Sequence, residues 1–175
     1  GDAALSSRTE AVLQVVYLIF NAGYVSTRDE AVVEVDLCRE AIRLGRLLHS
    51  LLPEDSEVAG LLALMLLHDA RRAGRADTAG RLVPLAEQDR SRWDTEQIAE
   101  GLRLVRGALT AGPLGRYQLQ AAIAALHAEA PTAQEIDWPQ ILALYGLLTR
   151  LMPGSLVELN KAVAVAEVHG PQAAL

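Results

Sequence analysis

The stretch LPEDSEVAGLLALMLL, residues 52–67, decides the fold of this chain. Pro53 ends one helix, because the proline ring lacks an N–H and clashes with the preceding turn, and Ser56 opens the next helix. The apolar run from Val58 to Leu67 is too short to span a bilayer, which takes ~20 residues. The wider chain is rich in Ala and Leu, which lose little side-chain freedom in a helix. This stretch therefore predicts two helices that meet at a tight joint.

Similar start and stop signals recur along the chain and predict seven helices of roughly 12 to 25 residues. Three starts carry a capping box, in which a Ser or Thr precedes a Glu by three residues: Ser7 with Glu10, Thr27 with Glu30, and Ser155 with Glu158. No alternating strand pattern competes, so the predicted class is all-α. The predicted starts and stops are Ser7 to Gly23, Thr27 to Pro53, Ser56 to Gly74, Asp94 to Gly112, Arg116 to Glu129, Asp137 to Pro153, and Ser155 to Gly170.

One long inter-helix loop interrupts this series between Arg75 and Trp93. It has no helical period, and a short extended piece is expected at residues 82–83. Long loops inside compact domains tend to be functional or disordered, and this one is not of low complexity. We expect Trp93 to anchor the loop on the helices. The charged residues before it then pair with neighbouring helices or with a ligand: Asp89, Arg90 and Arg92.

Short connections between successive helices predict antiparallel neighbours. Pro53 and Pro153 stand at similar joints, and Tyr145 precedes the second joint by eight residues. This pattern resembles the tetratricopeptide repeat and predicts helical hairpins stacked as a right-handed solenoid in a single domain, residues 1–175. Gly45 and the long loop depart from the repeat, so a plain antiparallel bundle stays open. The end of the chain, 172–175, reads as the first turn of an eighth helix and suggests a fragment of a longer protein.

Composition excludes several classes of protein. The chain is 51% hydrophobic and 22% charged, which rules out intrinsic disorder. A net charge of −6 argues against a nucleic-acid-binding module, which is usually basic. The single cysteine, Cys38, excludes an internal disulfide and a Cys-rich zinc site, and its mid-helix position predicts a buried core residue. With no signal peptide or membrane span in the sequence, we expect a cytoplasmic protein.

No arrangement of residues indicates an enzyme. The chain has no nucleophile-elbow motif, no phosphate-binding loop, and no two histidines spaced four residues apart. We therefore expect no catalytic residue, no metal and no cofactor. Four arginines between residues 71 and 81 form a local basic cluster without aromatic neighbours. The cluster is interpreted as a solvated helix end rather than a nucleic-acid contact: Arg71, Arg72, Arg75 and Arg81.

Polar residues on the Ala-rich helix 116–129 indicate either a wet groove on the concave side of a solenoid or a plain solvent face. They are Gln118, Gln120, His127 and Glu129. Asn21 and Tyr24, after the first helix, and Asn160, inside the last, are similar cases, because Asn is a poor mid-helix residue unless it forms a hydrogen bond.

Five segments together resemble the long C-terminal extension of one subgroup of extracytoplasmic-function RNA polymerase sigma factors. They are VYLIFNAGY at 16–24, LLALMLLHDAR at 61–71, QDRSRW at 88–93, YQLQAAIAA at 117–125 and HAEAP at 127–131. Ala22 and Lys161 depart from the pattern of that subgroup. The sigma regions that bind core polymerase and promoter DNA are absent from this sequence, so the chain cannot recognise a promoter by itself.

The resemblance implies a tetratricopeptide-like regulatory domain that acts by protein contact. Its expected partners are the sigma regions of its own protein and the RNA polymerase core, with a small YCII-related protein as a further candidate. The alternative is a metabolite sensor whose groove is built from Tyr24, Trp93 and Tyr117. Neither reading involves a membrane or direct nucleic-acid binding. The candidate partner- or ligand-binding residues are Asn21, Tyr24, His68, Asp69, Asp89, Arg90, Arg92, Trp93, Gln118, Gln120, His127 and Asn160.

Overall fold

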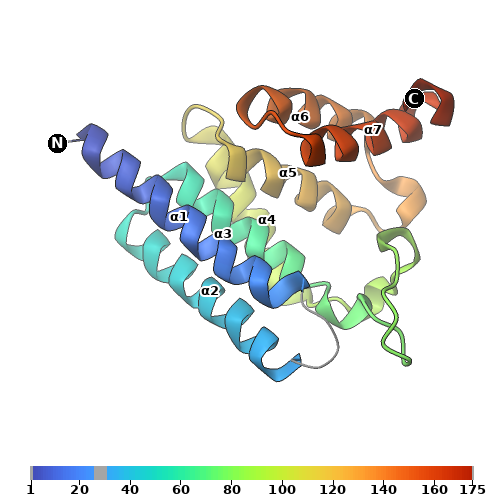
Figure 1. The fold of residues 1–175 in the computed structure, drawn as a ribbon, viewed down its shortest axis with the longest axis horizontal. Coiled ribbons are helices and arrows are strands. Elements are labelled where there is room, and N and C mark those ends of the chain that lie inside the picture. The colour runs from blue at the N-terminus through green and yellow to red at the C-terminus, as the bar shows by residue number, and fades with distance from the viewer. Residues whose placement is uncertain (1, 26–30, 175) are drawn as a thin grey trace.

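A computed structural model describes residues 2–25 and 31–174, and in them the chain forms seven α-helices (Figure 1). Within these residues the only β pairing is one isolated antiparallel bridge, between Ala76 and Leu82. The all-α prediction is confirmed. The helices are α1 Asp2–Val25, α2 Ala31–Leu51, α3 Ser56–Asp69, α4 Thr95–Thr110, α5 Arg116–Glu129, α6 Trp138–Leu151 and α7 Ser155–His169.

Side chains before the helices explain several of these starts. Asp94 caps α4 by accepting hydrogen bonds from two backbone N–H groups of the first turn, as its position predicted. Asp55 performs the same role for α3, so the cap is one residue before the predicted Ser56. Pro139, in the first turn of α6, costs nothing there because the N–H groups of that turn have no partner within the helix.

Several predicted helix boundaries are wrong or lie outside the described residues. The predicted stop at Gly74 is one of them, because α3 ends at Asp69. Ser7 lies within α1, which begins at Asp2, and Gly23 does not end that helix. Ser155 is the first residue of α7 rather than its cap, and Gly154 before it provides no side-chain hydrogen bond. The capping box predicted at Thr27 and Glu30 lies outside the described residues.

Helix α3 is the centre of the molecule. Its residues 58–67 are all buried, because α1, α2, α4 and α5 pack around it. A helix that is apolar on all sides is stable only when it is surrounded in this way. The α6–α7 hairpin packs on α5 and closes a second, smaller apolar cluster. Successive helices run antiparallel (Figure 1), whereas the right-handed, tetratricopeptide-like stacking stays a prediction.

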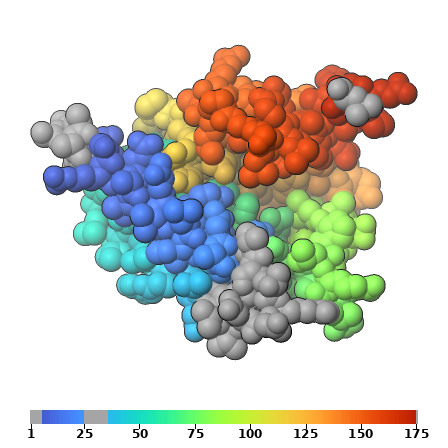
Figure 2. Space-filling model, in the orientation of Figure 1, coloured from blue at the N-terminus to red at the C-terminus, as the bar shows by residue number. Residues whose placement is uncertain are grey.

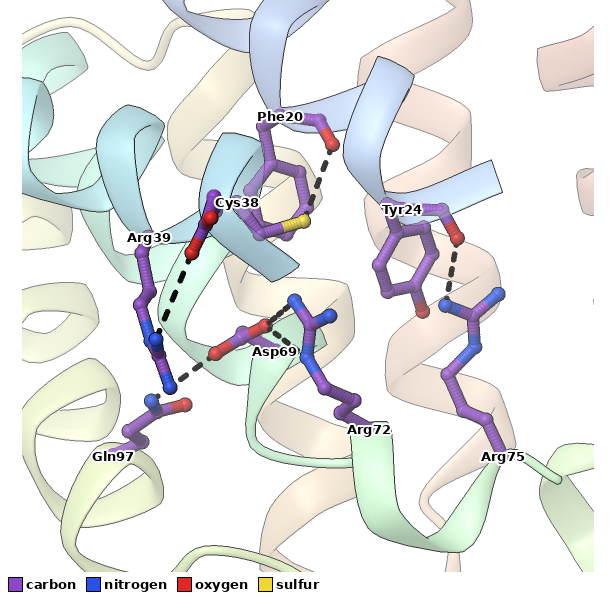
Figure 3. Close-up of polar contacts among 9 residues, drawn as sticks. Phe20, Tyr24, Cys38, Arg39, Asp69, Arg72, Arg75 and Gln97 are labelled. Carbon is purple, nitrogen blue, oxygen red and sulfur yellow. Dashed lines mark hydrogen bonds and ion pairs between the residues drawn. The ribbon is translucent and has the colours of Figure 1, made fainter. Parts of the chain in front are cut away.

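Two close contacts fix this packing. Gly60 of α3 lies so near α5 that a Cβ atom would stand 2.7 Å from the backbone nitrogen of Gln118. The predicted core cysteine, Cys38, is fully buried, and its thiol donates a hydrogen bond of 3.5 Å to the carbonyl oxygen of Phe20 (Figure 3). Burial raises the pKa of this thiol.

The antiparallel order brings alternate connections together. The C-terminal turns of α1, α3 and α5 meet at one end of the molecule, which also holds the segment 70–94 between α3 and α4 (Figure 1). The turns α2–α3, α4–α5 and α6–α7 meet at the opposite end. In the described part of the chain, no helix has the length and apolar character that a membrane span requires.

Candidate functional site

Six residues gather where α1, α3 and α5 end, and we call this group the arginine end: Tyr24, His68, Arg71, Arg75, Arg90 and His127. Each is placed by the end of a helix or by the segment that follows α3. Tyr24 stands in the last turn of α1, where its ring stacks on Phe20 at 5.4 Å and lies 5.4 Å from the His68 ring. The aromatic rings thus fix Tyr24 against the end of α3.

Two arginines that follow α3 converge on Tyr24. Arg75 donates a hydrogen bond of 2.8 Å to the Tyr24 carbonyl oxygen, and its guanidinium carbon lies 3.6 Å from the centre of the Tyr24 ring (Figure 3). This is a cation–π contact. Arg71 donates a longer bond, of 3.4 Å, to the Tyr24 hydroxyl. The C-terminal turn of α1 is therefore covered by two positive charges.

A third arginine comes from the segment between α3 and α4. Arg90 donates a hydrogen bond of 2.7 Å to the carbonyl oxygen of His127, at the end of α5, and its guanidinium carbon lies 4.5 Å from the Trp93 ring. The His127 ring in turn meets Trp138 edge-on at 5.3 Å. Trp93 is only 5% exposed and packs against Gly74 of the same segment, so it is buried, while its anchoring of the segment on the helices stays a prediction.

The electrostatics of the arginine end are dominated by positive charge. Burial, reinforced by nearby Arg71 and Arg75, lowers the pKa of His68 to about 3. Burial, with Arg71 and Arg90, lowers the pKa of His127 to about 4. Both imidazoles are therefore neutral at pH 7. Burial also lowers the pKa of Arg71 and of Arg90, and their mutual repulsion adds to the effect on Arg90.

Several donors in this region lack a partner. Among the described residues, no carboxylate forms an ion pair with Arg71, Arg75 or Arg90. Three buried nitrogen atoms also form no hydrogen bond: Arg90 Nη2, His127 Nδ1 and Trp93 Nε1. Buried polar groups are nearly always bonded, so each of these atoms calls for an explanation. Figure 2 shows the segment after α3, in green, at the surface below the α6–α7 hairpin, in orange and red.

The structure corrects the interpretation of the basic cluster as a solvated helix end. Only Arg81 is fully exposed, and it pairs with Asp77 at 2.7 Å. Arg72 pairs with Asp69, which also accepts a 3.2 Å hydrogen bond from Gln97 (Figure 3). Asp69 therefore belongs to an internal network beside the arginine end. Arg71 and Arg75 point to Tyr24 instead, which the linear sequence did not reveal.

Two predicted residues of the long segment have local roles. Asp89 caps the short turn that follows it, accepting hydrogen bonds from the backbone N–H and hydroxyl of Ser91. Among the described residues its carboxylate has no bond to a neighbouring helix, so the predicted helix contact is not found, and pairing with a ligand stays a prediction. Arg92 is exposed and lines a hollow of about 520 Å³ beside Asp69 and Gln97. Within the described part of the chain, Arg90 is the one of these three charged residues with a hydrogen bond to a neighbouring helix.

Neither interpretation of the polar residues on α5, as a groove or as a solvent face, fits Gln118. Gln118 is 1% exposed, and its amide bonds the Ala108 carbonyl at 2.7 Å and the Gly115 N–H at 2.6 Å. Gln120 donates to the Arg116 carbonyl within its own helix and to the Met152 sulfur, and it lines a hollow of about 260 Å³ beside Tyr17. Tyr117 lies at the other end of α5 from His127, beside Tyr17, so it shares no groove with Tyr24.

The remaining predicted residues lie apart from the arginine end. Asn21 bonds the hydroxyl of Tyr17 one turn earlier in α1. Asn160 is exposed on α7, and Glu129 is exposed and pairs with Arg106 at 3.4 Å. Within the described residues, no three His, Cys, Asp or Glu side chains come close enough to hold a metal ion.

Comparison with known proteins gives a family. Residues 8–109 match the family described as a family of unknown function, DUF6596. An uncharacterized protein of Rhizobium meliloti (strain 1021) is 46% identical over 170 residues, which cover 97% of this chain and 40% of that relative. The chain thus spans two fifths of the relative that it matches. No solved structure is significantly similar. The match over residues 8–109, more than half of the sequence, places the chain in the DUF6596 family.

Proposed function

We propose that this chain is the regulatory interaction domain of an extracytoplasmic-function RNA polymerase sigma factor, acting in the cytoplasm. One observation carries the proposal. Four of the five sequence segments that resemble the sigma-factor extension lie far apart in the chain, yet Tyr24, His68, Arg90 and His127 from these segments meet at the arginine end. Apolar residues in such segments are explained by packing in the core. Polar residues that come together from separate segments have no such explanation, and they support binding of a common partner.

Regulation would follow from a shift between two states of the protein, one with the sigma regions bound to this domain and one with them free. The domain would bind the sigma regions of its own protein in one state and release them in another, so a partner that prefers one state changes the fraction of active factor. The Rhizobium relative supports this scheme, because it has sequence outside the matched region that could hold such regions. The RNA polymerase core and a YCII-related small protein are the other proposed partners.

The test uses the longer protein that contains this domain. Transcription from a promoter that depends on the factor is compared between the intact protein, a version without the domain, and the variant Arg90→Gln. Deletion and Arg90→Gln are both expected to change transcription at least several-fold. The exposed variant Arg103→Gln, with the same change in charge, is the control and leaves transcription unaltered. Unchanged transcription after deletion would contradict the proposal.

A pull-down with the domain as bait identifies the partner. Polymerase subunits or the sigma regions of the same protein should bind the wild type and bind the Arg90→Gln variant less. The isolated domain, with its net charge of −6, should not shift DNA in a gel at moderate salt.

A metabolite-sensing domain is the second candidate, favoured by the unpartnered buried nitrogen atoms at the arginine end. In that case a small molecule, rather than a protein, would alter the state of the sigma regions. A change in transcription that depends on an added small molecule, in a system purified to the factor, RNA polymerase and promoter DNA, would favour this candidate.

A further inference from the structure

We infer that the arginine end is a binding site for an oxyanion, either a phosphate or a carboxylate group, held by Arg71 and Arg90 beside Tyr24 and His127. The inference does not depend on the sigma-factor proposal. It rests on three features of the described residues: an excess of positive charge, donors without partners, and side chains whose shape suits an oxyanion.

The first feature is uncompensated charge. Arg71, Arg75 and Arg90 are partly buried, and within the described chain none of them meets a carboxylate. Arg71 is the common neighbour, since its charge acts on His68, His127 and Arg90. Buried charges are normally paired, because removing an ion from water costs several kcal/mol. An anion bound among these arginines would supply the missing partner.

The second feature separates this site from ordinary helix capping. Arginines at helix C-termini bond free carbonyl groups and complement the helix dipole. Arg75 does so at α1 and Arg90 does so at α5. Capping leaves two observations unexplained: Arg90 Nη2 is buried without a partner, and Arg71 bonds only a hydroxyl at 3.4 Å. His127 Nδ1 is a further unbonded buried atom. The donors therefore exceed what the helix ends need.

The third feature is chemical fit. A guanidinium group presents parallel N–H donors whose spacing matches the two oxygens of a carboxylate or phosphate. A tyrosine hydroxyl and a neutral imidazole add donors of the same kind. The arginines would repel a cation. A nucleic acid would need an extended basic surface, whereas this chain has a net charge of −6. A small, local oxyanion is the ligand that the residues favour.

Thermal unfolding of the chain tests the inference with two probes, inorganic phosphate and citrate. Each is added at ~10 mM and compared with chloride at the same ionic strength, at pH 7.5. A ligand that binds only the folded state raises Tm, and a dissociation constant near 1 mM corresponds to a rise of about 3 °C. The anion that gives the larger rise distinguishes a phosphate site from a carboxylate site. If neither anion raises Tm above chloride, the inference is wrong.

A variant pair assigns the effect to this site. Arg71→Met removes the central charge while keeping an unbranched side chain, and Arg103→Met makes the same change at an exposed position of α4. Arg71→Met should have a higher Tm than wild type in chloride and no response to the anion, whereas Arg103→Met should respond like wild type. A purely structural role of Arg71 predicts a lower Tm instead. Should Arg71→Met fail to fold, Arg90→Gln replaces it, and a full anion response in that variant would overturn the assignment.

Discussion

The two ends of the helical bundle differ in how their buried polar groups are bonded. At the end where α4 meets α5, Glu57 accepts hydrogen bonds of 3.1 Å and 2.9 Å from the first N–H groups of α5, at Tyr117 and Gln118. The Gln118 side chain completes the network with the backbone of Ala108 and Gly115. Within this network the donors and acceptors match, although Arg116 Nη2, on the first residue of α5, has an ion pair with Glu10 at 3.4 Å and no hydrogen bond. At the arginine end, cationic donors accumulate and the acceptors run short.

We interpret this difference as a difference in role: one polar network holds the fold together and the other is available for binding. A closed network stabilises one fold, and losing either partner leaves a buried group unbonded. An incomplete network stabilises the free protein less than a closed one, but it leaves directed donors available to a ligand. On this view Gln118 and Glu57 hold α5 in place, and Arg71 and Arg90 are kept for binding.

The largest expected loss comes from Gly60→Ala, at the contact between α3 and α5. The new Cβ would stand 2.7 Å from the Gln118 nitrogen and 3.0 Å from the Gln118 Cα, and backbone atoms cannot move aside cheaply. We expect the free energy of unfolding to fall by about 3 kcal/mol in urea denaturation. Gly107→Ala is the control, because nothing lies within 4 Å of its Cβ; there we expect a gain of about 0.5–1 kcal/mol.

Gln118→Leu should be the next most harmful change. Leucine has a similar size but leaves the Ala108 carbonyl and the Gly115 N–H without their bonds, at a cost of about 2 kcal/mol. Gln120→Leu provides the comparison, since the Gln120 side chain is only partly buried and bonds the backbone of its own helix and the Met152 sulfur. Equal losses in both variants would mean that the closed network has no special role.

The arginine end should make stability depend on pH. His68 has a folded pKa of about 3 against an ordinary value of 6.5, and His127 has a pKa of about 4. Between each folded pKa and 6.5, the unfolded chain therefore binds more protons than the folded chain. The free energy of unfolding falls as the pH decreases below 6.5. The slope is at most about 1.4 kcal/mol per pH unit for each histidine.

The variant His68→Phe keeps an aromatic ring against Tyr24 but cannot titrate. Urea denaturation at pH 7, 6 and 5 should show a shallower decrease for this variant than for wild type. The exposed His169→Phe should keep the wild-type profile. A wild-type profile in His68→Phe as well would show that the ring is not held neutral by its surroundings.

The smallest expected effect is a gain. Replacing the buried charge of Arg71 by methionine should raise the free energy of unfolding by about 1 kcal/mol in the absence of any anion. Arg71→Met should raise the free energy of unfolding and Gln118→Leu should lower it under the same denaturation conditions. Opposite signs would show that buried polar groups have different roles at the two ends of the molecule.

The sequence predicted where helices begin and end better than it predicted the side-chain contacts between helices. Asp94 and the limits of α5 at Arg116 and Glu129 were correct, because caps and stops act within one turn of the chain. The burial of Trp93 was also predictable, since a large aromatic residue ends an otherwise polar segment. Local signals of this kind need no knowledge of the neighbouring helices.

Contacts between helices were not predictable in the same way. Gln118 resembled a groove residue because its partners, Ala108 and Gly115, are backbone groups that carry no sequence signal. Arg71 resembled an exposed residue of a helix end, because nothing nearby in the chain indicates that the end of α1 covers it. The antiparallel order alone could have placed the ends of α1, α3 and α5 together, and with them Tyr24, His68 and His127.

The most direct test of the central claim is an NMR titration of the chain with phosphate, followed through the imidazole, tyrosine and arginine side-chain signals. Shifts confined to His68, His127, Tyr24 and the arginines beside them are predicted, with Tyr117 and Gln118 unmoved. Citrate in place of phosphate would give the same map if the ligand is a carboxylate. Signals that change equally at both ends, or no change beyond that caused by chloride, would contradict the claim.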